Sequence, residues 1–204
     1  MAKAGPKHAA QGGDDVKARL IDATIRVLAR DGFAHASARA IATEAGGVNG
    51  LIFYHFGSMD QLLAATARTL TERGIVRIRQ GLGGDQADTE WPNRLGDVIR
   101  AEAAGDDGRA VMELLVGSRA SPVLAGEVRS AIDHALDFAT AQLERVLADS
   151  PLGQVVPVAL LAELAGAAFI GLEVLTQSGR EIDIDRLASH VALGLGALAA
   201  LTPR

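Results

Sequence analysis

The sequence predicts an all-α protein that begins with a helix-turn-helix unit, and three observations lead to this conclusion. Apolar residues recur at helical spacing of three and four in successive segments of the 204-residue chain. The segment 37–56 carries the start and stop signals of two short helices joined by a glycine turn. Hydrophobic residues make up 49% of the chain and aromatic residues only 3%, which indicates a core of closely packed Ala, Leu, Val and Ile.

The segment 37–56 explains the helix-turn-helix prediction residue by residue. Ser37 is a good N-cap because its hydroxyl can accept a free N–H group of the first turn. Gly46 stands where a left-handed residue commonly stops a helix, and Asn49 is expected to cap a second helix. The apolar face of that second helix is predicted to comprise Ile52, Phe53 and Phe56. In a helix-turn-helix unit the second helix enters the DNA major groove, whereas the alternative is an ordinary helical hairpin in an all-α core.

The run GFAHASARAIATEAGGVNGLIFYHFGSMDQLL, residues 32–63, resembles the N-terminal domain of the TetR family of one-component repressors. The resemblance covers roughly the first 75 residues. The positions that fit the family pattern are Phe33, Ser37, Ile41, Ala42, Ala45, Gly46, Gly50, Ile52, His55, Phe56, Ser58, Asp60, Leu62 and Leu63. The departures are Gly47 and Val48 in the turn, Phe53 in place of a Tyr, and Met59 in place of a Lys.

The resemblance implies binding to a double-stranded DNA operator. The residues expected to contact DNA are Lys17, Ser37, Arg39, Asn49, Gly50, Leu51, Phe53, Tyr54 and His55. Arg39 lies in the first turn of its helix, where the guanidinium can grip a phosphate or pair with guanine O6 and N7. Asn49 can read adenine, an apolar side chain such as Leu51 can meet a thymine methyl group, and Gly50 would let the backbone approach closely.

Four departures leave an alternative function open. Phe53 lacks the hydroxyl of the phosphate-binding Tyr that the family has, and Met59 lacks the ammonium group of its Lys. Gly47 and Val48 further alter the turn. The alternative is therefore a ligand-binding helical dimer whose DNA-binding head is degenerate.

Composition excludes several classes of protein. The chain has no Cys, which excludes a disulfide scaffold and thiolate metal sites and fits a reducing cytoplasm. The net charge of −5 argues against non-specific coating of nucleic acid, but residues 1–60 hold seven Lys/Arg against six Asp/Glu. No nucleophile–base pair or Gly-rich phosphate loop stands out, so we expect no enzyme activity and no cofactor. His134 and Asp137 are spaced like half a metal site, but surface polar residues are the better interpretation.

The expected domains are a disordered arm (1–13), a DNA-binding domain (14–60) and a body (81–204), with a linking helix at 58–80. The first helix is expected at about 15–30, with a buried stripe that includes Leu20, Ile25 and Leu28. The body helices are predicted at about 91–104, 107–119, 122–149, 155–177 and 184–201.

The segment 155–175 is the most apolar and approaches the length of a membrane span. Glu163 and Glu173 interrupt it and no Lys/Arg cluster flanks it, so we expect protein rather than lipid to cover it. In the resembled family the last two helices form a four-helix interface in a homodimer. The residues this implies are Ala162, Gly166, Ala167, Gly171, Val191, Gly194 and Leu198.

The resemblance also implies a small-molecule effector that binds in the body and releases the repressor from its operator. Its pocket would be mostly Leu, Val and Ala, with Trp91, Met112 and Phe138 as large walls, which suggests an apolar compound. The sequence does not identify the effector, the operator, or whether transcription is repressed or activated.

Overall fold

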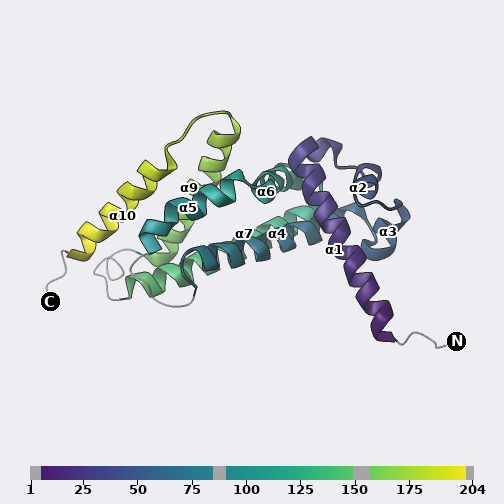
Figure 1. Ribbon diagram of the computed structural model, residues 1–204, viewed down its shortest axis with the longest axis horizontal. Helices are drawn as coiled ribbons and strands as arrows, with labels where there is room; N and C mark the ends of the chain where they lie inside the picture. The colour runs from purple at the N-terminus through teal and green to yellow at the C-terminus, as the bar shows by residue number, and fades with distance from the viewer. Residues whose placement is uncertain (1–5, 85–90, 149–156, 201–204) are drawn as a thin grey trace. The chain divides into compact units, whose positions relative to one another are not determined.

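The computed structural model describes residues 6–84, 91–148 and 157–200, and in these residues every regular element is a helix (Figure 1). The α-helices are α1 (Pro6–Asp31), α2 (Ala38–Glu44), α3 (Gly50–Phe56), α4 (Met59–Gly81), α5 (Trp91–Ala104), α6 (Asp106–Gly117), α7 (Pro122–Leu147), α9 (Val158–Gln177) and α10 (Ile184–Ala200). Two 3₁₀ turns, η1 (Phe33–His35) and η2 (Ser118–Ala120), connect helices. The all-α prediction is confirmed.

The chain divides into two compact units. Unit 1 comprises Met1–Leu70 and Asp106–Ala131, and unit 2 comprises Thr71–Gly105 and Ile132–Arg204. Helices α4 and α7 contribute residues to both units. These compact units differ from the expected functional domains, because α6 and the start of α7 group with the N-terminal helices.

Helix α1 is buried on two faces rather than along the single stripe that the sequence suggested. One face packs against α2, α3 and the start of α4, and it contributes Leu20, Ala23 and Val27. The other face packs against α4, α6 and α7, and it contributes Ile25 and Leu28. Helix α1 is therefore the common support of two core clusters in unit 1.

The buried hydroxyl groups of Thr24 and Thr66 in unit 1 are satisfied within their own helices. The Thr24 hydroxyl donates to the Leu20 carbonyl at 2.7 Å, and the Thr66 hydroxyl donates to the Leu62 carbonyl at 2.9 Å. Both threonines are fully buried, and an unpaired hydroxyl there would cost stability. These bonds allow polar side chains to lie in an otherwise apolar core.

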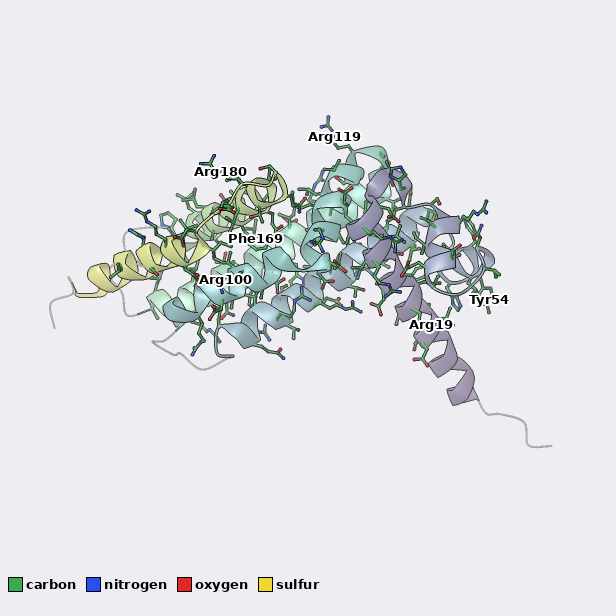
Figure 2. All side chains as sticks on the ribbon, turned by 45° about the horizontal axis from the view of Figure 1, so that its top comes forward. Arg19, Tyr54, Arg100, Arg119, Phe169 and Arg180 are labelled. Atoms are coloured by element: carbon green, nitrogen blue, oxygen red, sulfur yellow. The ribbon has the colours of Figure 1, made fainter. Side chains whose placement is uncertain are left out.

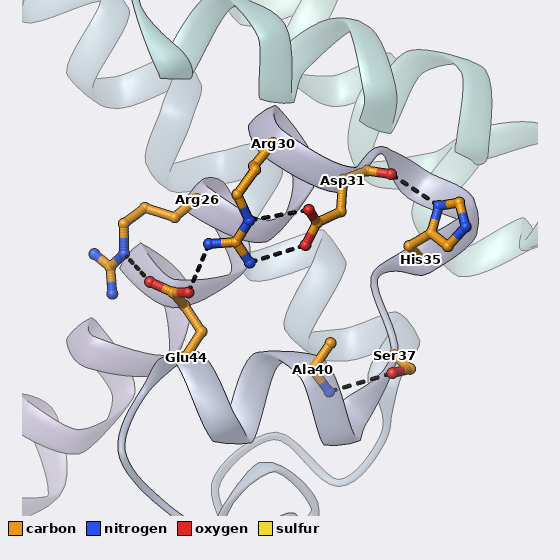
Figure 3. Close-up of polar contacts among 7 residues, drawn as sticks. All are labelled: Arg26, Arg30, Asp31, His35, Ser37, Ala40 and Glu44. Atoms are coloured by element: carbon orange, nitrogen blue, oxygen red, sulfur yellow. Dashed lines mark hydrogen bonds and ion pairs between the residues drawn. The ribbon is translucent and has the colours of Figure 1, made fainter.

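An ionic cluster joins the exposed edges of α1 and α2 (Figure 3). The Glu44 carboxylate accepts from Arg26 Nε at 2.7 Å and from Arg30 at 2.9 Å, and Arg30 also donates to Asp31. Hydrogen bonds from Arg26 and Arg30 lower the pKa of Glu44, and a hydrogen bond from Arg30 lowers the pKa of Asp31. Because the folded-state pKa values are depressed, this cluster stabilises unit 1 at neutral pH and loses that effect as pH falls through them.

Polar contacts among the described residues attach α6 and the start of α7 to the N-terminal helices. The backbone N–H of Phe33 donates to the Glu113 carboxylate at 2.6 Å. The Ser121 hydroxyl donates to Asp60 Oδ2 at 2.6 Å. Arg68 donates to both carboxylate oxygens of Glu127, at 2.9 and 2.6 Å. Phe33 packs against the core cluster of α1, α4, α6 and α7.

In unit 2, α5 packs against α10 and α9 (Figure 1). Gly96 of α5 allows this approach, because an added Cβ would lie 3.1 Å from the Ala188 Cβ of α10. Arg77 of α4 forms a bidentate ion pair with Glu102 of α5, and Arg100 of α5 forms an ion pair with Asp185 of α10. Unit 2 thus has glycine contacts and ion pairs between helices of its own.

The predicted body helices are confirmed to within a few residues, with small differences at their ends. Helix α6 ends at Gly117, immediately before η2, and α9 begins after Pro157. The arm expected at 1–13 overlaps α1, which begins at Pro6; proline is tolerated in the first turn because that N–H needs no helical partner. Residues 1–5 lie outside the described part of the chain.

The contact between Gly117 and Phe33 gives a direct test of packing in unit 1. A Cβ at Gly117 would overlap the Phe33 ring, so we expect Gly117→Ala to lower the free energy of unfolding by about 1–3 kcal/mol in urea denaturation. Gly126→Ala is the control, because an added Cβ there meets nothing within 4 Å, and it should be neutral or stabilising. Equal stability of Gly117→Ala and the wild type would contradict this packing.

Candidate nucleic-acid interface

The turn before α3 is built from backbone hydrogen bonds and left-handed glycine. Ser37 caps α2 as predicted, its Oγ accepting from the Ala40 N–H at 3.2 Å. Gly46 has φ 67° and ends α2, and the Gly47 N–H then donates to the Ala42 carbonyl at 2.9 Å. These bonds hold α2 and α3 at a fixed separation, as the helix-turn-helix prediction requires.

The prediction that Asn49 caps α3 through its side chain is wrong. Asn49 has helical backbone angles, φ −52° and ψ −33°, and its side chain makes no capping hydrogen bond. The first turn of α3 is closed instead by backbone bonds, from Leu51 N–H to the Val48 carbonyl and from Ile52 N–H to the Asn49 carbonyl. The amide group of Asn49 is exposed and remains available to an external partner.

Helix α3 turns one face inward and the other to solvent. Ile52 is 0% exposed and belongs to the core cluster with Ile41 and Ala42 of α2. Tyr54 is 83% exposed and projects from the ribbon of unit 1 (Figure 2). Phe53 is 51% exposed, so it does not form part of the buried face that the sequence analysis assigned to it. The outward face therefore consists of two aromatic rings beside a glycine, Gly50, around which space is open.

Leu51 is less exposed than expected for a DNA contact, whereas Val48 is highly exposed. Leu51 is half-buried against the core, and its Cδ1 would lie 3.1 Å from a Cβ at Gly47. Leu51 thus fills the space that Gly47 leaves free. Its side chain is therefore less accessible to DNA than predicted. Val48, which the sequence analysis treated only as a departure, is 68% exposed at the turn. The signal that could have identified it is an aliphatic residue in a turn that otherwise contains Gly and Asn.

The remaining predicted DNA contacts lie around this face. Arg39, on the first turn of α2, is exposed, as is Lys17 on α1. Among the described contacts Arg39 makes no ion pair. His55 is half-buried, and its ring lies edge-on to the Tyr54 ring with centroids 4.9 Å apart. The Ser37 hydroxyl is exposed but already accepts the capping hydrogen bond.

The three predicted pocket residues are not seen as one group. Phe138 is half-buried in unit 2, where the Arg79 guanidinium lies 5.5 Å from the centroid of its ring. Met112 is half-buried on α6 in unit 1. The side chain of Trp91 lies outside the described residues. A shallow open hollow of about 310 Å³ along α4 is lined by Glu72, Arg73, Val76 and Arg77, so it contains none of the three predicted residues.

Two of the predicted interface residues are committed to contacts within the chain. Ala162 is 1% exposed, so it packs inside the protomer and is excluded from a surface that meets a partner. Gly166 lies against Leu136, whose Cδ2 would be 3.2 Å from an added Cβ. Ala167 and Val191 are exposed, and space around Gly171 is open. The side chains of Gly194 and Leu198 fall outside the described residues.

Sequence reasoning missed the larger residues of the same surface. Leu160, Leu164 and Val174 of α9 are exposed and lie in register with Ala167 and Gly171. Their spacing of four, three, four and three residues places them on one face of the helix, and this spacing was the available signal. Helix α9 is also long and apolar enough to cross a membrane by length and composition, and only 17% of it is buried in the chain. One such helix is weak evidence for a membrane.

Comparisons with known proteins agree with this geometry. Residues 20–75 match the family model described as "Bacterial regulatory proteins, tetR family". The chain is 30% identical over 106 residues to an uncharacterized HTH-type transcriptional regulator of Mycobacterium tuberculosis, covering 52% of this chain and 54% of that protein. It is 30% identical over 103 residues to HdnoR, an HTH-type nicotine-responsive transcriptional repressor of Paenarthrobacter nicotinovorans, covering 50% and 53%. The chain thus spans about half the length of these relatives.

The fold extends beyond the matched segment. The crystal structure of a TetR transcription regulator from Haloarcula marismortui aligns with a TM-score of 0.71 over 91% of this chain and 98% of that one, at 19% identity. At that identity the likeness shows a shared helical fold. The N-terminal segment, residues 20–75, is thus similar to the tetR family of bacterial regulatory proteins, and the similarity to the two relatives extends over about half of this chain.

Proposed function

We propose that this protein is a TetR-like, DNA-binding transcriptional repressor that a small apolar ligand releases from its operator. The observation that carries the proposal is the outward face of α3. The helix is fixed by buried Ile52 while Gly50, Phe53 and Tyr54 face solvent, and the match to the tetR family covers this segment. A helix that packs on the core through one face and exposes the opposite face is suited to enter a major groove.

The functional domains of this proposal are a DNA-binding head (14–60), a connecting helix (58–80) and a body (81–204). The polar contacts of Glu113, Ser121 and Glu127 support a second connection, because they tie α6 and the start of α7 to the N-terminal helices. Since α4 and α7 each contribute residues to both compact units, a change in unit 2 can reach the head along either helix. The body takes up the effector, and HdnoR, whose name describes a nicotine-responsive repressor, is a precedent for such control.

A homodimer is part of the same proposal. The exposed stripe of α9, from Leu160 to Val174, extends over roughly 20 Å at about 1.5 Å per residue. Leu187 and Val191 of α10 add further exposed apolar surface. Such a surface on a protein in the cytoplasm requires a cover, and a second copy provides one with the same geometry. Glu163 on α9 makes lipid a poorer cover than protein, because a charge in the hydrocarbon region is costly.

The second candidate is a ligand-binding helical dimer whose head no longer binds DNA. Phe53 and Met59 favour it, because they lack the hydroxyl and ammonium groups with which the resembled family holds phosphates. An enzyme is not proposed, since the related proteins are described as transcriptional regulators. Selection of duplexes from a random-sequence DNA pool by the purified protein separates the two candidates. Enrichment of a common sequence, called the selected duplex below, supports the repressor, and no enrichment supports the degenerate head.

Arg39 tests the head directly. If Arg39 reads a base, Arg39→Ala should weaken binding to the selected duplex by about 1–3 kcal/mol for each half-site, as measured by fluorescence anisotropy. If it holds a phosphate, the variant should instead reduce the salt dependence of binding by about one unit for each half-site on a log–log scale. Arg119→Ala is the control, because Arg119 is an exposed arginine of unit 1 on η2. Unchanged affinity and salt dependence in Arg39→Ala would remove Arg39 from the interface.

Gly171 tests the dimer. Because an added Cβ at Gly171 meets nothing within the chain, Gly171→Leu should leave the protomer folded but overpack the interface, at about 1–3 kcal/mol. Sedimentation velocity should show a wild-type dimer and a weaker one for the variant. Gly126→Leu is the control, because the space around Gly126 is also open and Gly126 belongs to α7, outside the proposed interface. A wild type that is monomeric at micromolar concentration would refute the dimer.

Release by a ligand has a thermodynamic signature. A compound found by thermal-shift screening should weaken binding to the selected duplex, typically 5–150-fold, and saturating duplex should raise the Kd of that compound by the same factor. Titration calorimetry with and without the duplex measures both effects. A tightly bound compound that leaves DNA affinity unchanged is not the effector, and if every such compound behaves so, the proposed release mechanism is wrong.

A further inference from the structure

The start of α3, which this head would present to a major groove, carries no charged side chain. In a helix-turn-helix unit the residues at the start of the second helix contact base edges. Here that position is occupied by Val48, Asn49 and Gly50, and α3 itself contains no Lys or Arg. Recognition from this end of the helix therefore depends on an aliphatic side chain and an amide.

Val48 is the aliphatic group that geometry leaves free for this purpose. It is 68% exposed, whereas the neighbouring Leu51 packs back over Gly47 and the core. Space around Gly50 is open, so no side chain at that position keeps the turn away from a ligand surface. Burying the isopropyl group of Val48 lowers the free energy of binding only if the group that covers it is also apolar.

In the major groove the apolar group is the 5-methyl of thymine. Thymine alone carries a methyl group there, whereas cytosine has only a hydrogen at C5 and the purines have none of this apolar surface, so contact with the methyl group distinguishes thymine from the other three bases. Asn49 lies beside Val48, and because it does not cap α3 its amide is free to bind adenine N6 and N7 in a neighbouring pair. Both side chains thus favour A·T pairs at the same place.

We propose that Val48 reads a thymine in each half-site through its 5-methyl group, next to an adenine bound by Asn49. This inference rests on the proposed DNA-binding function. It assigns the thymine contact to the turn, in place of Leu51, and specifies the base composition that the leading end of α3 recognises.

The test replaces each thymine of the selected duplex, one at a time, by deoxyuridine, which removes the methyl group and keeps every Watson–Crick hydrogen bond. At one thymine per half-site the Kd should rise about fourfold, the value expected for one buried methyl group. Val48→Ala changes both subunits of the dimer, so it should bind the thymine duplex about 16-fold more weakly than the wild type, about fourfold for each half-site, and should no longer distinguish thymine from deoxyuridine at those positions. Val116→Ala is the matched control, because Val116 is 66% exposed on α6, and it should retain the full preference for thymine.

The possible outcomes separate this inference from the proposed function. If no duplex is enriched, the DNA-binding function itself fails. If a duplex is enriched but deoxyuridine is tolerated at every position, the methyl contact does not exist. If the deoxyuridine penalty persists unchanged in Val48→Ala, another side chain reads the methyl group and the assignment to Val48 is wrong.

Discussion

The packing of α2 and α3 on one face of α1 is the constraint on which the head depends. Ile41 and Ala42 from α2 and Ile52 from α3 are essentially inaccessible to solvent, where they meet Leu20 and Val27 of α1. Each short helix has only seven residues, too few to be stable alone, so this burial is what keeps it helical. Burying Ile52 also fixes the rotation of α3, and the rotation decides that Phe53 and Tyr54 face solvent.

The second face of α1 explains why unit 1 reaches beyond the N-terminal helices. Ile25 and Leu28 need a cover that α2 and α3 do not provide, and α4, α6 and α7 supply it. The polar contacts of Glu113 and Ser121 then set the positions of α6 and α7 relative to η1 and the start of α4. Within unit 1, these contacts attach α6 and the start of α7 to the N-terminal helices.

Local signals predicted much of this architecture. Ser37 as a cap, Gly46 as a stop and Pro122 as a helix start depend on chemistry within a few residues, and all three are confirmed. The errors have tertiary causes. Leu51 turned inward because Gly47 leaves room for it, and Ala162 is buried by neighbours within its own chain, neither of which a helical pattern reveals. Spacing alone also did not distinguish the inner residues of α9 from its exposed stripe, and the assignment of DNA, ligand and interface residues stays a prediction.

The central claim is that two such heads present α3 to DNA together, and footprinting tests it most directly. Hydroxyl-radical cleavage of the selected duplex in the presence of the wild-type protein reports which segments of DNA are covered. Two protected segments related by symmetry should appear, with centres one helical turn of about 10–10.5 base pairs apart or a multiple of that spacing. A single protected segment, or uniform protection along the duplex, would contradict the account.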